Sequence, residues 1–198
     1  MQLPGLNASA ALGYDVTNIV MQRISVEDLY CDYTQGRREF KNIDLSGAHL
    51  FEGELQGIDL EGSDLSHAYL PYVNLSRANL RGARLHHTDL SHAKLQSVDL
   101  SEADCQNSLM NRANLCYATC WKTLFQTVSL QGADLRSADF SHAQLNRVDL
   151  SSSNLSAAMF KETQFIDCNL FRAQAAVLKD ANLDRLTVLP NGYRQADS

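Results

Sequence analysis

Large apolar residues recur at every fifth position from Leu45 to Leu170, through twenty-six consecutive pentads. Nineteen of these positions are Leu and four are Phe, and the remaining three are Cys105, Met110 and Cys120. A second series lies two residues before the first, and all its members are small or β-branched, most often Ala. A period of five fits neither the about 3.6 residues of a helical turn nor the two-residue alternation of a strand. The pattern therefore predicts a chain that turns at regular intervals, as in a solenoid.

The same pattern divides the chain into four segments. Residues 1–23 have no periodicity and are expected to form a flexible tail. Residues 24–39 contain a short capping helix and a lead-in, and residues 40–175 carry the repeat. In residues 176–198 the spacing of five continues briefly on a shifted register and then reaches a Leu-Pro-Asn-Gly turn, which predicts a C-terminal cap and tail.

The capping helix is predicted from its end signals. Ser25 stands at the N-cap position, Asp28 follows three residues later as in a capping box, and Gly36 ends the segment. Apolar residues at helical spacing between them would form one face. A lid of this kind is needed because the first coil of a solenoid exposes apolar core and unpaired backbone groups.

Several pentads read Ala-Asn-Leu or Ala-Asp-Leu, as at residues 78–80 and 133–135. These units resemble the A(D/N)LXX motif of the pentapeptide-repeat family over most of the chain. The lead-in at residues 26–40 and the closing residues 189–192 are similar to the ends of cyanobacterial members, among them the heterocyst differentiation regulator. The resemblance implies an all-β fold, a right-handed quadrilateral β-helix with one pentad on each side and four in each coil. Twenty-six pentads and a cap then give about seven coils.

Composition excludes several functional classes. The chain has 23 acidic and 17 basic residues and a formal net charge of −6, which argues against direct binding of nucleic acid. It lacks a secretory signal and any run of about 20 apolar residues, so we expect a cytoplasmic protein without a membrane partner. The five cysteines are odd in number, and four lie inside the repeat, which favours reduced thiols.

No catalytic constellation stands out from the repeat. His67, His86 and His87 are close in sequence, and His67 and His87 should stack one coil apart, yet no carboxylate or cysteine completes a metal-ligand set. The glycines are scattered turn residues rather than a phosphate-binding loop. The sequence therefore predicts no enzyme activity, no cofactor and no metal site.

The outward positions point to a contact surface. Residues twenty apart should stack on one face, and the face of Leu50, Leu70 and Leu90 is the most apolar of the four. The coil at residues 104–125 also departs from the pattern, because apolar side chains replace polar ones at its outward positions. The competing interpretation is that exposed apolar residues are common and pack against one another. The candidate partner-binding residues are Tyr69, Tyr72, Leu109, Cys116, Tyr117, Trp121 and Leu124.

Three functions remain open at this point. The first is a non-enzymatic protein-interaction or scaffold module, a rigid rod that binds another protein and regulates it; a monomer is favoured over a dimer. The second follows from the family resemblance: some members protect DNA gyrase from quinolones by mimicking duplex DNA, and two faces here are moderately acidic. The third is a purely structural repeat without a strong partner.

Overall fold

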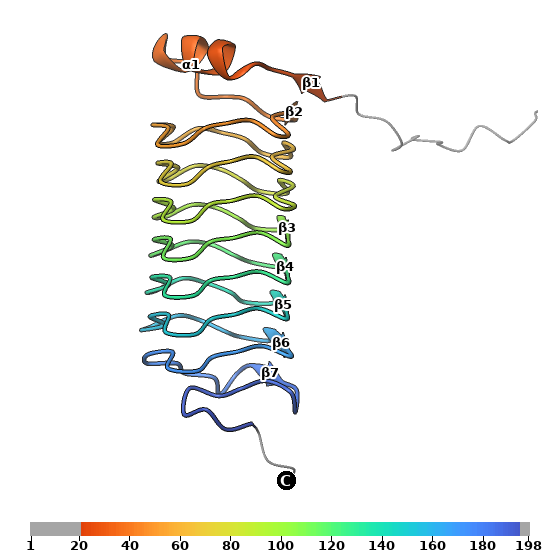
Figure 1. Ribbon diagram of the computed structural model, residues 1–198, viewed down its shortest axis with the longest axis vertical. Coiled ribbons are helices and arrows are strands. Elements are labelled where there is room, and N and C mark those ends of the chain that lie inside the picture. Colours follow the sequence, from red (N-terminus) through yellow and green to blue (C-terminus); the bar gives the residue numbers. More distant parts are fainter. Residues whose placement is uncertain (1–20, 195–198) are drawn as a thin grey trace, which may run out of the picture.

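Successive coils of the chain stack in parallel with a register of twenty residues (Figure 1). The computed structural model describes residues 21–194. Cys105 pairs with Phe125, Phe125 with Leu145, and Leu145 with Phe165. Twenty residues hold four pentads, so each coil has four sides and the predicted quadrilateral β-helix is confirmed. The strands of this sheet are β3 (Asp104–Gln106), β4 (Leu124–Gln126), β5 (Gln144–Asn146), β6 (Gln164–Ile166) and β7 (Asn182–Leu183).

The number of coils is slightly larger than the predicted seven. One column of parallel bridges joins eight residues, one from each coil, because the C-terminal cap still pairs with the last regular coil. These residues are His49, Tyr69, Asp89, Leu109, Ser129, Asp149, Asn169 and Val188.

The central residue of every pentad points into the rod. The residues of this series from Leu45 to Leu170 are all buried, with exposed fractions of 3% or less. Four phenylalanines stack in the C-terminal half, with ring centroids of Phe125 and Phe140 5.7 Å apart and those of Phe140 and Phe160 5.5 Å apart. Each fully buried side chain of this size contributes about 1.5–3 kcal/mol before chain entropy is subtracted, so the core is a large favourable contribution to the stacking of the coils.

Hydroxyl groups in the small series are satisfied inside the rod. Thr88, Thr123 and Thr163 are buried, and each donates a side-chain hydrogen bond of 2.6–2.8 Å to a backbone carbonyl 23 residues earlier. A buried hydroxyl without such a partner would destabilise the fold. Small polar residues are therefore tolerated at these positions because the preceding coil supplies an acceptor.

Each pentad ends in a turn that places its last residue in the left-handed region. Gly82 has a φ of +63°, but most pentads have a residue other than glycine at this position, for example Tyr72 at 59° and His92 at 60°. The amide of the next pentad's small residue then bonds the carbonyl of the central residue, as Ala83 does to Leu80 at 3.0 Å. This turn redirects the chain by one side of the coil.

The N-terminal end is covered by helix α1 (Val26–Thr34). The Ser25 side chain accepts a hydrogen bond of 3.0 Å from the Asp28 amide, so the predicted N-cap is confirmed. Leu29 is fully buried against the first coil, and the Tyr33 hydroxyl donates to the Gln56 carbonyl at 2.8 Å. No helix within residues 21–194 is long and apolar enough to cross a membrane.

One short strand precedes this helix. Residues Gln22–Arg23, at the end of the predicted tail, form β1, which pairs in parallel with β2 (Ile43–Asp44). Arg23 holds this strand in place through an ion pair of 3.2 Å with Asp44. The rest of the predicted tail, residues 1–20, lies outside the described part of the chain.

Up to residue 194, where the described part of the chain ends, the C-terminal end closes without a helix. The predicted change of register is present, since Phe165 pairs with Leu183, 18 residues later, and Asn169 with Val188, 19 residues later. Leu178 and Leu183 pack against the core and are only partly buried. This end of the rod is thus less completely sealed than the other.

Candidate protein-interaction surface

Five aromatic side chains form one connected group on the face of Leu50, Leu70 and Leu90. The ring centroids of His49 and Tyr69 are 4.7 Å apart, and those of Tyr72 and His92 are also 4.7 Å apart with nearly parallel planes. Phe51 joins the two pairs, at 6.1 Å from Tyr69 and 5.9 Å from Tyr72. We call these five residues the ring cluster.

The coil geometry explains this arrangement. Residues twenty apart lie in one column and about 4.8 Å apart, which is close to the stacking distance of two rings. His49 and Tyr69 occupy one column, and Tyr72 and His92 another. Phe51, Tyr69 and Tyr72 nevertheless keep 40–48% of their surface exposed. The cluster is therefore ordered by its own contacts while much of its apolar surface faces solvent.

Charged groups lie along one edge of the ring cluster. An open groove of about 360 Å³ runs beside Tyr72 and His92, lined by Glu52, Glu54 and Lys94. Glu54 accepts a hydrogen bond of 2.6 Å from Asn74 and lies 4.0 Å from Lys94. The surface thus combines apolar rings with a rim of both charges, as in the cores and rims of protein interfaces.

The candidate residues of the 104–125 coil do not form one site. Leu109 and Tyr117 are exposed at 43% and 61%, whereas Trp121 and Leu124 are half-buried. Their pentads belong to four different sides of the coil, so one flat partner surface cannot contact all of them. Trp121 is also covered by Lys122, whose Nζ lies 4.2 Å from the ring centroid.

The expected exposure of Cys116 is wrong, because this residue is only 4% exposed. Asp134 and Arg136 of the next coil cover it, and Arg136 forms a two-pronged ion pair with Asp134 at 2.7–3.1 Å. Burial, followed by a hydrogen bond to Asp134, raises the pKa of the Cys116 thiol. Cys116 therefore cannot contribute to a contact surface.

The sequence pattern predicts only part of the ring cluster. Tyr69 and Tyr72 are among the predicted partner-binding residues, and Phe51 lies on the face predicted to be the most apolar, whereas His49 and His92 were not predicted to join them. The signal was present, since each histidine lies twenty residues from a tyrosine.

Two other histidines, His67 and His87, stack on a neighbouring face. The rings of His67 and His87 are parallel, with centroids 4.9 Å apart, as predicted. His86 instead contacts a carboxylate, with its Nε2 2.8 Å from Oδ2 of Asp104. Within residues 21–194, no group of three or more His, Cys, Asp or Glu side chains is placed to hold a metal ion.

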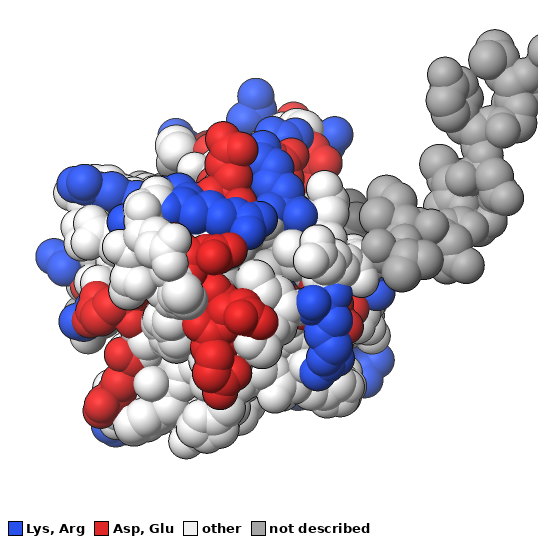
Figure 2. All heavy atoms as spheres, turned by 90° about the horizontal axis from the view of Figure 1, so that it is seen from above, with Lys and Arg blue, Asp and Glu red and all other residues white. Residues whose placement is uncertain are grey.

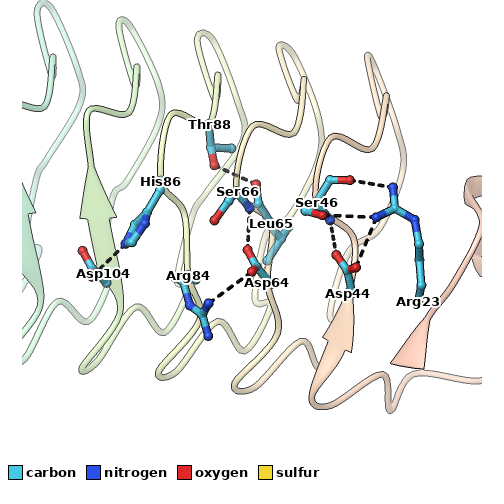
Figure 3. A network of polar contacts seen from close by, with 10 residues as sticks. All are labelled: Arg23, Asp44, Ser46, Asp64, Leu65, Ser66, Arg84, His86, Thr88 and Asp104. Carbon is cyan, nitrogen blue, oxygen red and sulfur yellow. Dashed lines mark hydrogen bonds and ion pairs between the residues drawn. The ribbon is translucent and has the colours of Figure 1, made fainter. Parts of the chain in front are cut away.

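On the two acidic faces, those of Leu45 and of Leu60, several carboxylates are paired with cations. Figure 3 shows one of these faces, where Arg23 contacts Asp44 at 3.2 Å and Arg84 contacts Asp64 at 3.3 Å. Hydrogen bonds from Ser46, together with the Arg23 charge, hold the pKa of Asp44 below its ordinary value.

The other acidic face is paired in the same way. Lys41 lies 2.8 Å from Glu61 and 3.2 Å from Asp59, and Arg81 lies 2.8 Å from Glu102. Figure 2, which looks onto the N-terminal end, shows the same mixture of basic and acidic side chains lying next to one another. The surface is thus a mosaic of charges and not a continuous acidic stripe.

Comparison with known families gives one clear match. A family model described as pentapeptide repeats matches eight copies, over residues 39–66, 58–96, 93–132 and 133–172. These ranges cover more than half of the chain. No curated protein matches the sequence at a significant level.

Solved structures of repeat proteins are also similar. The plasmid-mediated fluoroquinolone resistance protein QnrB1 has a TM-score of 0.58 and 22% identity, covering 74% of this chain and 81% of that protein. HetL, a protein involved in heterocyst differentiation regulation from Nostoc sp. strain PCC 7120, has a TM-score of 0.31 and 24% identity, covering 87% of this chain and 100% of HetL. The identity to QnrB1 is too low to show more than a common architecture.

Proposed function

Because the chain belongs to the pentapeptide-repeat family, we propose that it is a non-enzymatic protein-interaction module that binds another protein through the ring cluster. The observation that carries the proposal is the contact between the rings, which orders three exposed aromatic side chains on a rigid support. The ring cluster replaces the 104–125 coil as the binding face, since its side chains lie on one side of the rod.

Preorganisation of the rings lowers the cost of binding a partner. Binding normally costs about 0.5–1.5 kcal/mol for each flexible side chain that becomes ordered. The stacking of Tyr72 on His92 and the ring contacts of Phe51 restrict these side chains before a partner arrives. Tyrosines at the centre of an interface are also frequent hot spots. A small cluster can therefore contribute most of the affinity.

The test is recovery of a partner from native cell extract, followed by mass spectrometry. The double variant Tyr69→Ala and Tyr72→Ala should weaken capture of the specific partner by roughly thirtyfold, since hot-spot side chains contribute about 2 kcal/mol or more. The matched control is Tyr117→Ala with Trp121→Ala, which removes two aromatic residues from other faces. The proposal would be contradicted if the Tyr69→Ala and Tyr72→Ala variant captured the partner as well as the unmodified protein, or if the control variant lost capture.

We expect the module to be monomeric. Sedimentation at several protein concentrations measures this directly. A concentration-dependent dimer that disappears in the Tyr69→Ala and Tyr72→Ala variant would instead make a second copy the partner.

Mimicry of DNA is less well supported. A DNA mimic presents unpaired negative charge along its length, whereas Asp59, Glu61, Asp64 and Glu102 each contact a lysine or arginine here. The fold shared with a fluoroquinolone resistance protein nevertheless makes gyrase a sensible target for an assay. We expect no change in supercoiling, with or without quinolone, at micromolar protein.

A further inference from the structure

One side of the last coil is not paired to the coil before it. On the face of Leu60, Leu80 and Leu100, the final bridge joins Asp139 to Met159. The next two sides of the last coil do pair, through β6 with β7 and through Asn169 with Val188. Within residues 21–194, one bridge is therefore missing from an otherwise continuous ladder, beside the segment that leads into β7. Figure 1 shows β7 near the C-terminal end of the rod.

The preceding coil shows which backbone hydrogen bonds the missing bridge would supply. There, three backbone hydrogen bonds of 2.9 Å connect this side to the next coil. They join Ser137 N–H to the Ser156 carbonyl, Met159 N–H to the Ala138 carbonyl, and Phe140 N–H to the Met159 carbonyl.

The equivalent groups one coil later lack such partners. Within the described part of the chain, the amides of Ala157 and Phe160 and the carbonyl of Ala158 form no backbone hydrogen bond to the last coil. Pairing resumes only at Glu162, whose amide donates to the Asp180 carbonyl at 2.8 Å. Two donors and one acceptor are left at an open sheet edge.

The shortened register is the cause. Phe165 pairs with Leu183 after 18 residues, so the last coil is two residues too short to follow this side. The space beside it is a cavity of about 600 Å³, within the range of about 300–1,000 Å³ typical of binding pockets. Met159 and Val177 line it and are 52% and 57% exposed.

We propose that this edge binds an extended segment of a partner protein as an added β-strand. Unpaired N–H and C=O groups at a sheet edge are a template for another strand, and main-chain hydrogen bonds supply much of the affinity in such complexes. A peptide strand satisfies both donors and the acceptor at once, which a single side chain does not.

The surroundings also define the side chains of that segment. Alternate residues of a strand point to opposite sides, so one set would lie on Met159 and Val177 and should be apolar. The rim carries two carboxylates, Glu162 and Asp180, against Lys161. The other set should therefore be basic. This site is independent of the ring cluster, because it lies on another face in the other half of the rod.

Hydrogen–deuterium exchange of the free protein tests the open edge. The amides of Ala157 and Phe160 should exchange faster than those of Ser137 and Phe140 by about two orders of magnitude, because only the latter pair with the next coil. These two control amides occupy the same positions one coil earlier. Equal protection of the two sets would show a closed edge and overturn the proposal.

Binding is tested with a capped synthetic peptide in which Val and Lys alternate. It should bind in fluorescence anisotropy and protect the Ala157 and Phe160 amides from exchange. The same peptide with N-methylated backbone, and one in which Val and Glu alternate, should bind weakly or not at all. Absence of binding by the Val-Lys peptide at millimolar concentration, or equal binding of the N-methylated form, would overturn the proposal.

Variants of the cavity complete the test. Met159→Ser with Val177→Ser should weaken binding of the Val-Lys peptide by roughly tenfold, since it removes apolar contact area. Ile166→Ser is the matched control, because Ile166 is similarly exposed, at 42%, but lies on the paired strand β6. Thermal unfolding verifies that both variants fold, and equal weakening by both would contradict the assigned cavity.

Discussion

The two ends of the rod are closed by different means. At the N-terminal end, α1 lies over the first coil, and Leu29 and Phe40 have no exposed surface. At the C-terminal end, the chain closes on itself through a shortened coil, and Val177 and Leu186 remain 57% and 49% exposed. In this rod, the helix therefore seals its end more completely than the shortened coil does.

The physical reason lies in the backbone. A helix satisfies many of its own N–H and C=O groups, so it can cover the apolar core without matching the register of the coil that it covers. A further coil must match that register to pair with it. The last coil is two residues shorter and leaves one side unpaired, so the C-terminal end carries an open edge. The N-terminal end, which a helix covers, does not meet this constraint.

The largest expected effect comes from truncating one leucine at each end. Leu29→Ala should lower the free energy of unfolding by about 2–5 kcal/mol, as in other fully buried leucines. Leu186→Ala, the same substitution at the half-exposed end, should change it by about 0.5 kcal/mol or less. Chemical denaturation of both variants measures the difference. Equal losses would mean that the two ends are equally sealed.

A second test concerns the contact between α1 and the first coil. A Cβ atom at Gly53 would clash with the Tyr30 hydroxyl, so Gly53→Ala forces Tyr30 to move. We expect a loss of about 1–3 kcal/mol in the free energy of unfolding, as in other overpacked sites. Adding Tyr30→Phe removes the clashing oxygen and should restore most of that loss. Gly53→Ala without any loss would show that α1 is loosely held.

The sequence was sufficient for the fold because the pentad period determines which residues face inward. It also predicted the helix from Ser25 and Asp28, since capping signals are local. It failed where packing between neighbouring coils decides the outcome. Cys116 stands at an outward position of its own pentad, but Arg136, twenty residues later and thus in the next coil, covers it together with Asp134.

The unpaired side of the last coil could not be predicted from the sequence, again because packing between neighbouring coils decides it. The change of register after Ala175 is visible as a break in the spacing of five. Whether the shortened coil still pairs on each side depends on how residues 176–181 cross the end of the rod, and no periodic pattern describes that path. The two His–Tyr pairs of the ring cluster, by contrast, were predictable from residues twenty apart once the coil length was known.

A smaller effect is expected from the cap of α1. Ser25→Ala removes the acceptor of the Asp28 amide and should lower the free energy of unfolding by about 1 kcal/mol. Ser25→Gly should cost only a few tenths of a kcal/mol, because glycine is tolerated at N-cap positions. Denaturation curves of the two variants measure the difference. A larger loss for glycine than for alanine would argue against the capping role.

Alkaline pH should weaken the fold through its buried thiols. Burial raises the pKa of Cys168 to about 11 and also raises the pKa values of Cys105 and Cys120. The unfolded chain ionises these thiols nearer their ordinary value of 9.0. Their contribution to stability is therefore complete below that value and is lost as the pH rises toward the folded pKa. Replacing Cys168 with Ala should reduce the loss of stability between about pH 9 and 11.

Thiol labelling sharpens the comparison of the two ends without changing stability. Cys31 is exposed on α1 and should react first with a thiol reagent in the native protein. Among the three thiols inside the rod, Cys168 should react before Cys105 and Cys120, because it lies in the last regular coil beside the less completely sealed end, whereas Cys105 and Cys120 lie in the middle of the rod. Mass spectrometry of the labelled protein gives the order. Reaction of Cys105 before Cys168 would mean that the rod opens in its middle and not at its C-terminal end.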